Sequence, residues 1–318
     1  MRTTDIHAPQ FAKTILGPFN RARLGFPRHI FTGAGGIGDA VLCTTVLHEF
    51  KKRNPSSRIG MHTPYVSLFD RNPDAGFIIP PARALVSGFL HAGLDFTRLA
   101  YSSYDPATDR DTPLKEHILA TICRIAGITG TIDLRPYFFL SPAELAAGRR
   151  FEKQIAIQSS SLGSLYTMAN KAWLPDRFQW IASRLVPEAP LIQLGSPEDP
   201  PLEGALDLRG KTTLRESAAI LANSLIFLGG VGFLMHLARA VDCRSVIVYG
   251  GRETPELTGY IANANLTGPT PCSPCWLRSK CDFGHECMNM IPAESALEAA
   301  QKLIALHGTP LETETANL

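Results

Sequence analysis

The first residues able to do chemistry are an acid and a run of glycines between an apolar segment and a helical pattern. The run Gly33–Asp39 follows the β-prone segment His29–Thr32. A strand that turns through four glycines into a helix exposes backbone N–H groups to a ligand. The carboxylate of Asp39 would project from the first helical turn at the mouth of a cleft and not into the core, so these residues are a candidate site. The alternative is a helix cap that touches no ligand.

A second glycine turn opens a helix in the second half of the chain, over residues 228–238. The N-terminal amides and dipole of such a helix can hold a phosphate or pyrophosphate. His236 lies in the first turn, where it could donate a hydrogen bond to the same anion; the alternative is a histidine packed within the helix. The residues assigned to this anion site are Gly229, Gly230, Gly232, Phe233, Leu234, Met235 and His236.

A lysine follows the first strand expected in the second half, at the same edge of the sheet as this turn. Lys171 carries a flexible ammonium, which can neutralise a phosphate as a point charge. The alternative is a solvated surface lysine. A further glycine pair, Gly250-Gly251, follows a later strand, so glycine turns recur at strand ends in this half.

Four of the seven cysteines crowd into one short segment and are candidate metal ligands. Four thiolates suit a closed tetrahedral zinc or iron site, and the two-residue gap within the first pair is typical of one. The alternative is a cysteine-rich structural loop. The other three are expected to be buried, reduced thiols. The candidate ligands are Cys272, Cys275, Cys281 and Cys287; the others are Cys43, Cys123 and Cys243.

Composition indicates a globular protein of two ordinary domains: 318 residues, of which 45% are hydrophobic and 19% charged. A net charge of +2 without a long basic run argues against a nucleic-acid partner. No apolar run of membrane-spanning length occurs, and residues 1–5 begin no signal peptide, so a cytoplasmic location is expected.

Several basic residues gather around the first strand and helix. They would favour peripheral contact with the anionic inner surface of the cytoplasmic membrane. The alternative is an ordinary solvated surface. These residues are Arg21, Arg23, Arg28, Lys51, Lys52 and Arg53.

Strands alternate with helices along the chain, which predicts parallel sheets with helices on both faces. Ser141 and Thr213 each begin a capping box. Helices are expected at 40–52, 83–92, 114–126, 178–185, 214–223, 233–241 and 292–306. Strands are expected at 29–32, 57–61, 76–80, 96–101, 154–158, 191–194, 225–228 and 245–249, with a polar loop at 102–111.

The same pattern divides the chain into two doubly wound α/β domains that face each other across a cleft. The first is expected at 1–150 and the second at 151–308, the latter carrying a cysteine-rich loop at 271–288. The polar tail at 309–318 is expected to be frayed.

The order of these motifs resembles glycosyltransferase family 9, the ADP-heptose:lipopolysaccharide heptosyltransferases. The likeness spans nearly the whole chain, through short segments in the family's order. These segments are 36–41, 57–60, 71–74, 171–178, 207–214, 234–238, 271–275 and 284–288.

The resemblance implies a GT-B fold, in which two Rossmann-like domains bind the acceptor mainly in the first and the nucleotide sugar in the second. Gly36 and Gly38 would lie on the acceptor side, and Asp39 matches the family's general base. Lys171 matches a phosphate-contacting lysine, and His236 follows the nucleotide-binding turn.

The family's ribose-binding carboxylate falls near Glu198 and Asp199. The family also has Asp-Ser/Thr-Gly before its Leu-Met-His, where this chain reads Val231-Gly232-Phe233. A side chain expected to touch the donor is therefore apolar here, which leaves the donor's identity open.

The activity implied by the resemblance is inverting transfer of a sugar, with heptose as first choice, from an ADP-heptose-like donor to a glycan or glycolipid acceptor such as lipopolysaccharide core. Catalysis would need no cofactor, and any zinc or iron would be structural. One alternative keeps the enzyme class with another nucleotide sugar or a protein acceptor. The other is a non-catalytic nucleotide-sugar-binding protein of the same fold.

Overall fold

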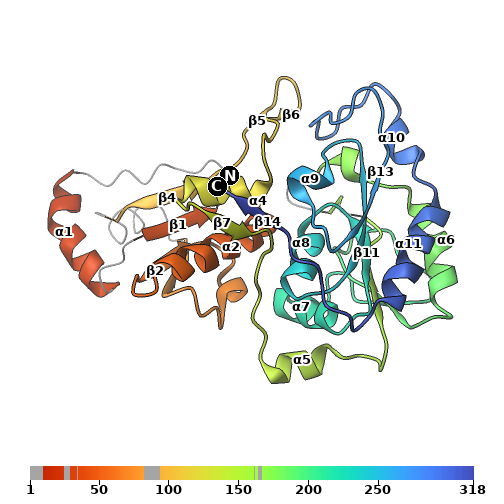
Figure 1. Ribbon diagram of the computed structural model, residues 1–318, viewed down its shortest axis with the longest axis horizontal. Coiled ribbons are helices and arrows are strands. Elements are labelled where there is room, and N and C mark those ends of the chain that lie inside the picture. Colours follow the sequence, from red (N-terminus) through yellow and green to blue (C-terminus); the bar gives the residue numbers. More distant parts are fainter. Residues whose placement is uncertain (1–9, 25–28, 34, 82–93, 161, 164–166) are drawn as a thin grey trace.

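A computed structural model describes residues 10–24, 29–33, 35–81, 94–160, 162–163 and 167–318 of the protein. The helix expected at 83–92 lies outside these residues. Two parallel sheets lie side by side in Figure 1, one from each half of the chain.

The first sheet has the strand order β3-β2-β1-β4, with all three pairings parallel. Alternate residues of a strand face the same side, so Phe31, Met61 and Leu99 point together into a core shared with α2 and α4. The elements are β1 (His29–Gly33), β2 (Ile59–His62), β3 (Phe77–Ile79), β4 (Phe96–Leu99), α1 (Gln10–Arg23), α2 (Ile37–Arg53), η1 (Val66–Phe69) and α4 (Ile118–Ile125). Sequence analysis did not predict α1.

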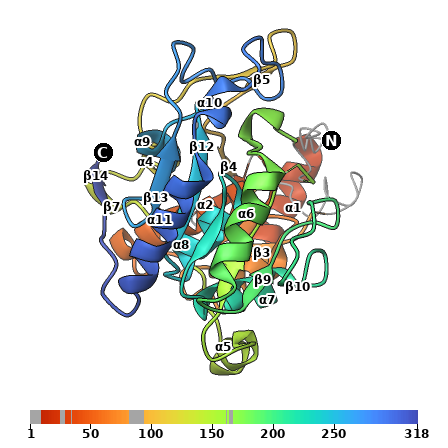
Figure 2. The same ribbon diagram turned by 90° about the vertical axis from the view of Figure 1, so that its right-hand side faces the viewer.

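The second sheet has the order β10-β9-β8-β11-β12-β13 and is also parallel. Ile155 and Ile157 pack towards α6 and α11, which lie in front of the strands in Figure 2. Ala156, between them, faces the core beneath α7 and α8. The strands are β8 (Ile155–Ile157), β9 (Leu191–Gln193), β10 (Ala205–Asp207), β11 (Phe227–Gly230), β12 (Ser245–Gly250) and β13 (Ala264–Thr267).

The helices of the second half alternate with its strands along the chain. The capping box at Thr213 is confirmed, because its hydroxyl accepts from the N–H of Glu216 while the Glu216 carboxylate accepts from the N–H of Thr213. The helices are η2 (Ala169–Lys171), α6 (Pro175–Leu185), α7 (Leu214–Ala222), α8 (Phe233–Ala240), α9 (Pro255–Thr258), α10 (Glu286–Asn289) and α11 (Ala293–Ala305).

One hydrophobic core runs from the first half into the second. It contains Val41 of α2 and Leu234 of α8, both buried. Gly38 of α2 lies against the start of α8, where an added Cβ would be 3.7 Å from Cα of Phe233. The packing therefore brings the N-termini of α2 and α8, and both glycine turns, together.

The segment between the sheets forms α5 (Pro142–Gly148), and its capping box at Ser141 is confirmed. This helix falls within the predicted first domain, yet it packs against α7 of the second half. Gly148 abuts Ala219, where a Cβ would collide with the Ala219 carbonyl. Arg215 of α7 also donates hydrogen bonds to the carboxylate of Glu144.

The polar tail is ordered, and the expectation that it frays is wrong. Its strand β14 (Thr315–Asn317) pairs antiparallel with β7 (Thr131–Asp133) of the first half. The N–H of Leu134 donates to the carbonyl of Glu314 at 2.8 Å, and that of Leu318 to Gly130 at 3.1 Å. Backbone pairing holds this segment, so its polar side chains do not prevent a strand from forming.

Deleting residues 312–318 should lower the melting temperature by roughly 3–6 °C, because β7 would lose its partner strand. A melting curve followed by circular dichroism measures this. Deletion of Leu318 alone is the matched control, since it spares the three paired residues of β14. Equal melting temperatures for the full chain and the longer deletion would contradict the stabilising role.

The loop expected at 102–111 contains a small hairpin, β5 (Tyr104–Asp105) and β6 (Arg110–Asp111). It reaches from the first half to the second-half loop that precedes α10 (Figure 1), where Arg110 forms an antiparallel bridge with Leu277. Among the residues that the structure describes, none of the helices combines the length and apolar character needed to cross a bilayer.

Candidate active site

A cleft of about 520 Å³ lies where the two glycine turns meet. The first half contributes the start of α2, including Gly36 and Gly38, together with Tyr101. The second half contributes Lys171 and the start of α8, including His236. Ligands of paired α/β domains bind in such clefts at the carboxyl ends of the strands.

Asp39 stands in the first turn of α2 and lines the cleft. Its carboxylate accepts a hydrogen bond from the hydroxyl of Tyr101 and one from the backbone N–H of Gly36. A Cβ at position 35 would collide with this carboxylate, so glycine there leaves Asp39 in its place. Asp39 thus caps its own helix and also faces a ligand-sized space, so the two roles proposed from the sequence are compatible.

The pKa of Asp39 is raised above its usual range, chiefly by burial. The hydrogen bonds from Tyr101 and Gly36 and the charge of Lys171 oppose the rise. A carboxylate in this setting is a stronger base than one in water.

Tyr101 is a site residue that sequence analysis missed. It follows β4 and lines the cleft, and its phenol donates to Asp39. Burial, together with the neighbouring charge of Asp39, holds the pKa of Tyr101 well above its usual range, so the phenol remains a donor. Its place at the carboxyl end of a predicted strand was the only available sequence signal.

Lys171 ends the short helix η2 and lines the cleft, with 16% of its side chain exposed. Its Nζ lies 2.6 Å from Oε1 of Glu253, so it is ion-paired and partly buried, and the surface-lysine alternative is not what the structure shows. Burial lowers the pKa of Lys171, and Glu253 opposes this. Burial also disfavours the ionised form of Glu253, but Lys171 and Arg252 outweigh it and hold that pKa below its usual range.

Only some of the residues predicted for the anion site at the turn into α8 line the cleft. Gly232, Phe233, Leu234 and His236 line the cleft. Gly229, Gly230 and Met235 are not among its lining residues. A Cβ on Gly229 would lie 2.6 Å from the ring of Phe227, and Met235 is fully buried in the core, so these two serve packing.

His236 is buried and neutral. Its Nδ1 lies 2.6 Å from the hydroxyl of Tyr260, and burial lowers its pKa to about 3. The charge of Lys171 adds to that shift. A neutral imidazole at this position can donate a hydrogen bond to an anion but adds no charge.

No protein-family model and no curated protein matches the sequence, whereas solved structures match over most of its length. The glycosyltransferase family 9 protein of Veillonella parvula is 15% identical, with a TM-score of 0.66 over 87% of this chain and 97% of that one. Escherichia coli ADP-heptose lipopolysaccharide heptosyltransferase II is 16% identical, with a TM-score of 0.64 over 87% and 98% of the two chains. The chain has the GT-B fold of these glycosyltransferases.

The GT-B fold predicted from the sequence is thereby confirmed, and so is the resemblance in architecture to family 9. A third match is TibC, an iron-containing dodecameric glycosyltransferase of enterotoxigenic E. coli. It is 18% identical, with a TM-score of 0.66 over 87% of this chain and 76% of TibC.

In this GT-B structure, the acids proposed for the donor's ribose are placed differently from each other. Glu198 is exposed and is not among the lining residues, whereas Asp199 is buried and lines the cleft. The Asp199 carboxylate accepts from the Ser196 N–H and from the side-chain amide of Gln158, both at 3.1 Å. Burial raises the pKa of Asp199. The ribose assignment of Glu198 stays a prediction, and Asp199 is the better-placed residue.

Val231, which replaces the family's acid, is 2% exposed and belongs to the hydrophobic core beside the cleft. Its side chain offers a donor no hydrogen bond. At this position the wall of the cleft therefore differs in chemistry from the motif that the resemblance implies, while the turn into α8 is kept.

The four cysteines of the second-half loop do not form a ligand cage. Burial raises the pKa of Cys287, and the nearby thiols of Cys275, Cys272 and Cys281 add to it. Yet no three His, Cys, Asp or Glu side chains within the described part of the chain converge closely enough for a metal ion. The thiols as placed do not fit the predicted zinc or iron site, which stays a prediction from the sequence.

Other contacts hold this loop in place. The side-chain amide of Asn170 donates to the carbonyls of Leu277 and Lys280 at 3.1 and 2.9 Å. His285 lies 2.9 Å from the amide oxygen of Asn170. These bonds favour the alternative of a cysteine-rich structural loop, anchored beside Lys171.

Proposed function

We propose that the chain is an inverting glycosyltransferase, which moves a sugar from a nucleoside diphosphate donor to a hydroxyl of a glycan acceptor. The observation that carries this proposal is that Asp39, Lys171, His236 and the start of α8 line one cleft. A candidate base and a candidate anion site thus line the same ligand-sized space.

Asp39 would accept the proton of the acceptor hydroxyl as that oxygen attacks the anomeric carbon. The bond from this carbon to the diphosphate oxygen breaks as the new glycosidic bond forms. A single displacement of this kind inverts the anomeric configuration. Tyr101 orients the carboxylate for this step through its hydrogen bond.

The departing diphosphate needs positive charge and N–H donors. Lys171 supplies a charge, the amides at the start of α8 supply donors and a helix dipole, and neutral His236 supplies a further hydrogen bond. These groups can stabilise the leaving group without a divalent cation, so we propose metal-independent transfer. A transfer rate unchanged by a chelator, and not restored or raised by added Mg²⁺, would support this.

Heptose from an ADP-linked donor, passed to an acceptor such as lipopolysaccharide core, is the substrate pair that we propose first. The support is the likeness to heptosyltransferase II and to TibC, which was solved with ADP-D-β-D-heptose. Val231 favours a second candidate, transfer of a different sugar, because the wall that it forms lacks a polar group for the donor.

A panel of nucleotide sugars incubated with candidate acceptors tests the proposal, with products detected by mass spectrometry. We expect ADP release and an acceptor heavier by one heptose. Transfer from another nucleotide sugar alone would support the second candidate. Tight nucleotide binding with no transfer to any acceptor would instead indicate a non-catalytic binding protein.

Replacement of Tyr101 by phenylalanine should lower kcat about tenfold and move the acid limb of its pH profile to higher pH. The hydrogen bond from Tyr101 lowers the pKa of Asp39, so its loss raises that pKa and protonates the base at a higher pH. Tyr65→Phe is the matched control, since Tyr65 also lines the cleft. An acid limb that stays in place would contradict the proposed contact.

Contact with the cytoplasmic face of the membrane stays a prediction. Several of the basic side chains proposed for it are engaged within the protein. Arg21 pairs with Asp95 at 3.1 Å, Lys51 donates to the carbonyl of Ser57, and Arg53 is bound to Glu49.

A further inference from the structure

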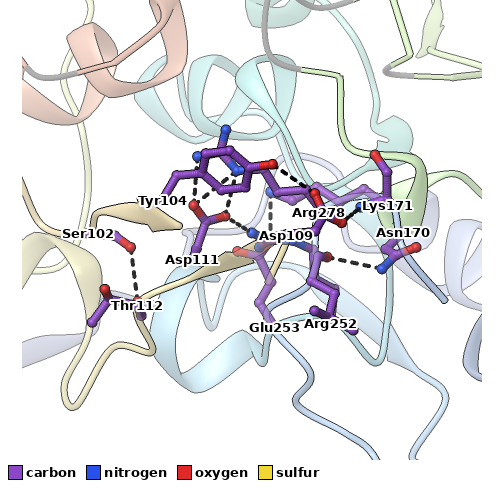
Figure 3. Close-up of polar contacts among 12 residues, drawn as sticks. Ser102, Tyr104, Asp109, Asp111, Thr112, Asn170, Lys171, Arg252, Glu253 and Arg278 are labelled. Atoms are coloured by element: carbon purple, nitrogen blue, oxygen red, sulfur yellow. Dashed lines mark hydrogen bonds and ion pairs between the residues drawn. The ribbon is translucent and has the colours of Figure 1, made fainter. Parts of the chain in front are cut away.

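Figure 3 shows the polar contacts between the hairpin β5–β6 of the first half and the second half, close to Lys171, which lines the cleft. The N–H of Asp111 donates to the carbonyl of Trp276 at 3.0 Å, and that of Arg278 to the carbonyl of Asp109 at 2.9 Å. The carboxylate of Asp109 accepts from the N–H groups of Ser279 and Lys280, both at 2.7 Å. These bonds fix the tip of the hairpin against the loop that follows Trp276.

Inside this contact lies a chain of alternating charges, which we call the ion chain: Arg278, Asp111, Arg252, Glu253 and Lys171. Asp111 binds Arg278, with N–O distances of 2.6 to 3.1 Å, and also Arg252. Arg252 in turn lies 2.8 Å from Glu253, which holds Lys171. The side chains of Asp111, Arg252 and Glu253 are each less than a tenth exposed, so the chain is dry at its centre.

The geometry at Glu253 links the two ends of the ion chain. Nζ of Lys171 and a guanidinium nitrogen of Arg252 contact the same oxygen, Oε1 of Glu253. Asp111 binds the other terminal nitrogen of Arg252. Without Asp111, the buried guanidinium of Arg252 would interact more strongly with the Glu253 carboxylate, because a buried charge must be compensated. It would then compete with Lys171 for the same carboxylate oxygen.

We propose that Asp111 is a positioning residue for Lys171. Through Arg252 and Glu253, it holds the ammonium of Lys171 at the cleft. The docking of a first-half hairpin then governs how tightly the second half binds a diphosphate. The inference rests on the proposed function, in which Lys171 contacts the donor. It adds a residue that touches neither substrate and that is remote from Lys171 in the sequence.

The charges around Lys171 give the sign of the effect. Glu253 and Asp111 favour the charged ammonium, whereas burial and Arg252 disfavour it. Asp39 and His236 also interact with Lys171, one an acid and the other neutral. Removing the charge of Asp111 should therefore lower the pKa of Lys171 further, and diphosphate binding should fail at a lower pH.

The test measures ADP binding by calorimetry at pH 7 and pH 9 for wild type, Asp111→Asn and Asp109→Asn. Asp109 secures the hairpin but does not belong to the ion chain, so its variant is the matched control. We expect Asp111→Asn to bind about tenfold more weakly, with a larger loss at pH 9 than at pH 7. Equal losses in both variants at both pH values would overturn the proposal, because hairpin docking alone would explain them.

A second measurement separates positioning from general damage. In a Lys171→Met background, Asp111→Asn should have no further effect on ADP affinity, because Asp111 acts only through Lys171. An undiminished loss in that background would overturn the proposal.

Melting curves of every variant show whether it folds. If Asp111→Asn does not fold, Arg278→Met takes its place, because it leaves Asp111 bound to Arg252. A small loss of affinity is then expected, and one as large as that of Lys171→Met would contradict the ion chain.

The proposed function can fail separately. Wild type that binds neither ADP nor UDP would refute it while leaving the ion chain open to direct measurement. NMR titration of ¹³C-methylated lysines, with Lys171 assigned from Lys171→Arg, reads that ammonium without a nucleotide. A lower pKa of Lys171 in Asp111→Asn than in wild type would support the positioning role, and an unchanged pKa would overturn it.

Discussion

Replacing Asp39 with asparagine should lower the transfer rate by about 10²- to 10⁴-fold, the range by which a general base contributes to catalysis. Affinity for ADP should change less than about twofold, because the proposed role of Asp39 is to accept a proton from the acceptor and not to hold the diphosphate. Product formation followed by mass spectrometry and ADP calorimetry measure the two effects.

Asparagine is the sharper choice because its side-chain oxygen can still accept from Tyr101 and from the N–H of Gly36, as the carboxylate does. The start of α2 should then stay capped, and the melting temperature should hold. A variant that transfers sugar at the wild-type rate would reduce Asp39 to a helix cap and refute the mechanism.

Replacing Lys171 with methionine should weaken ADP binding about 10- to 100-fold and slow transfer in parallel, since it removes the positive charge that we propose contacts the leaving group. The protein should still fold, because Glu253 keeps its ion pair with Arg252 at 2.8 Å. Calorimetry with ADP and with UDP reports the loss. Lys302→Met, on the exposed side of α11, is the control for removal of a surface charge.

The dependence on salt distinguishes two outcomes. If Lys171 contacts the diphosphate, raising the ionic strength should weaken nucleotide binding in wild type and much less in the variant. If wild type and Lys171→Met bound the nucleotide with equal affinity at low salt, Lys171 would be only a structural partner of Glu253.

The parts of the fold that could be predicted are those coded locally. Glycine turns between apolar strands and helices mark where α2 and α8 begin, and the capping boxes at Ser141 and Thr213 appear as expected. Asp39 and Lys171 were expected at one cleft because each follows a strand, and the carboxyl ends of parallel strands lie at the same edge of a sheet. Local spacing is enough for such features, because each needs only residues a few positions apart.

The partners of these site residues could not be predicted, because the contacts that define them are distant in sequence. Tyr101 meets Asp39 only after β4 has paired with β1. Glu253 meets Lys171 across 82 positions (253 minus 171), and Asp111 joins them only when a hairpin docks on the other half. Strand β14 was missed for the same reason, since its polar residues carry no apolar alternation and only β7 makes it a strand.

The pairing of β14 with β7 means that the chain crosses between the halves twice, once after β7 and once before β14. The two crossing segments lie side by side, where the N–H of Leu134 donates to the carbonyl of Glu314. A cut in the segment between α5 and β8 would therefore leave two fragments that still share a β-ladder. Such fragments, expressed separately, should assemble and restore the cleft without a covalent link. The last strand thus makes the molecule a natural subject for fragment complementation, with the C-terminal peptide as the tether.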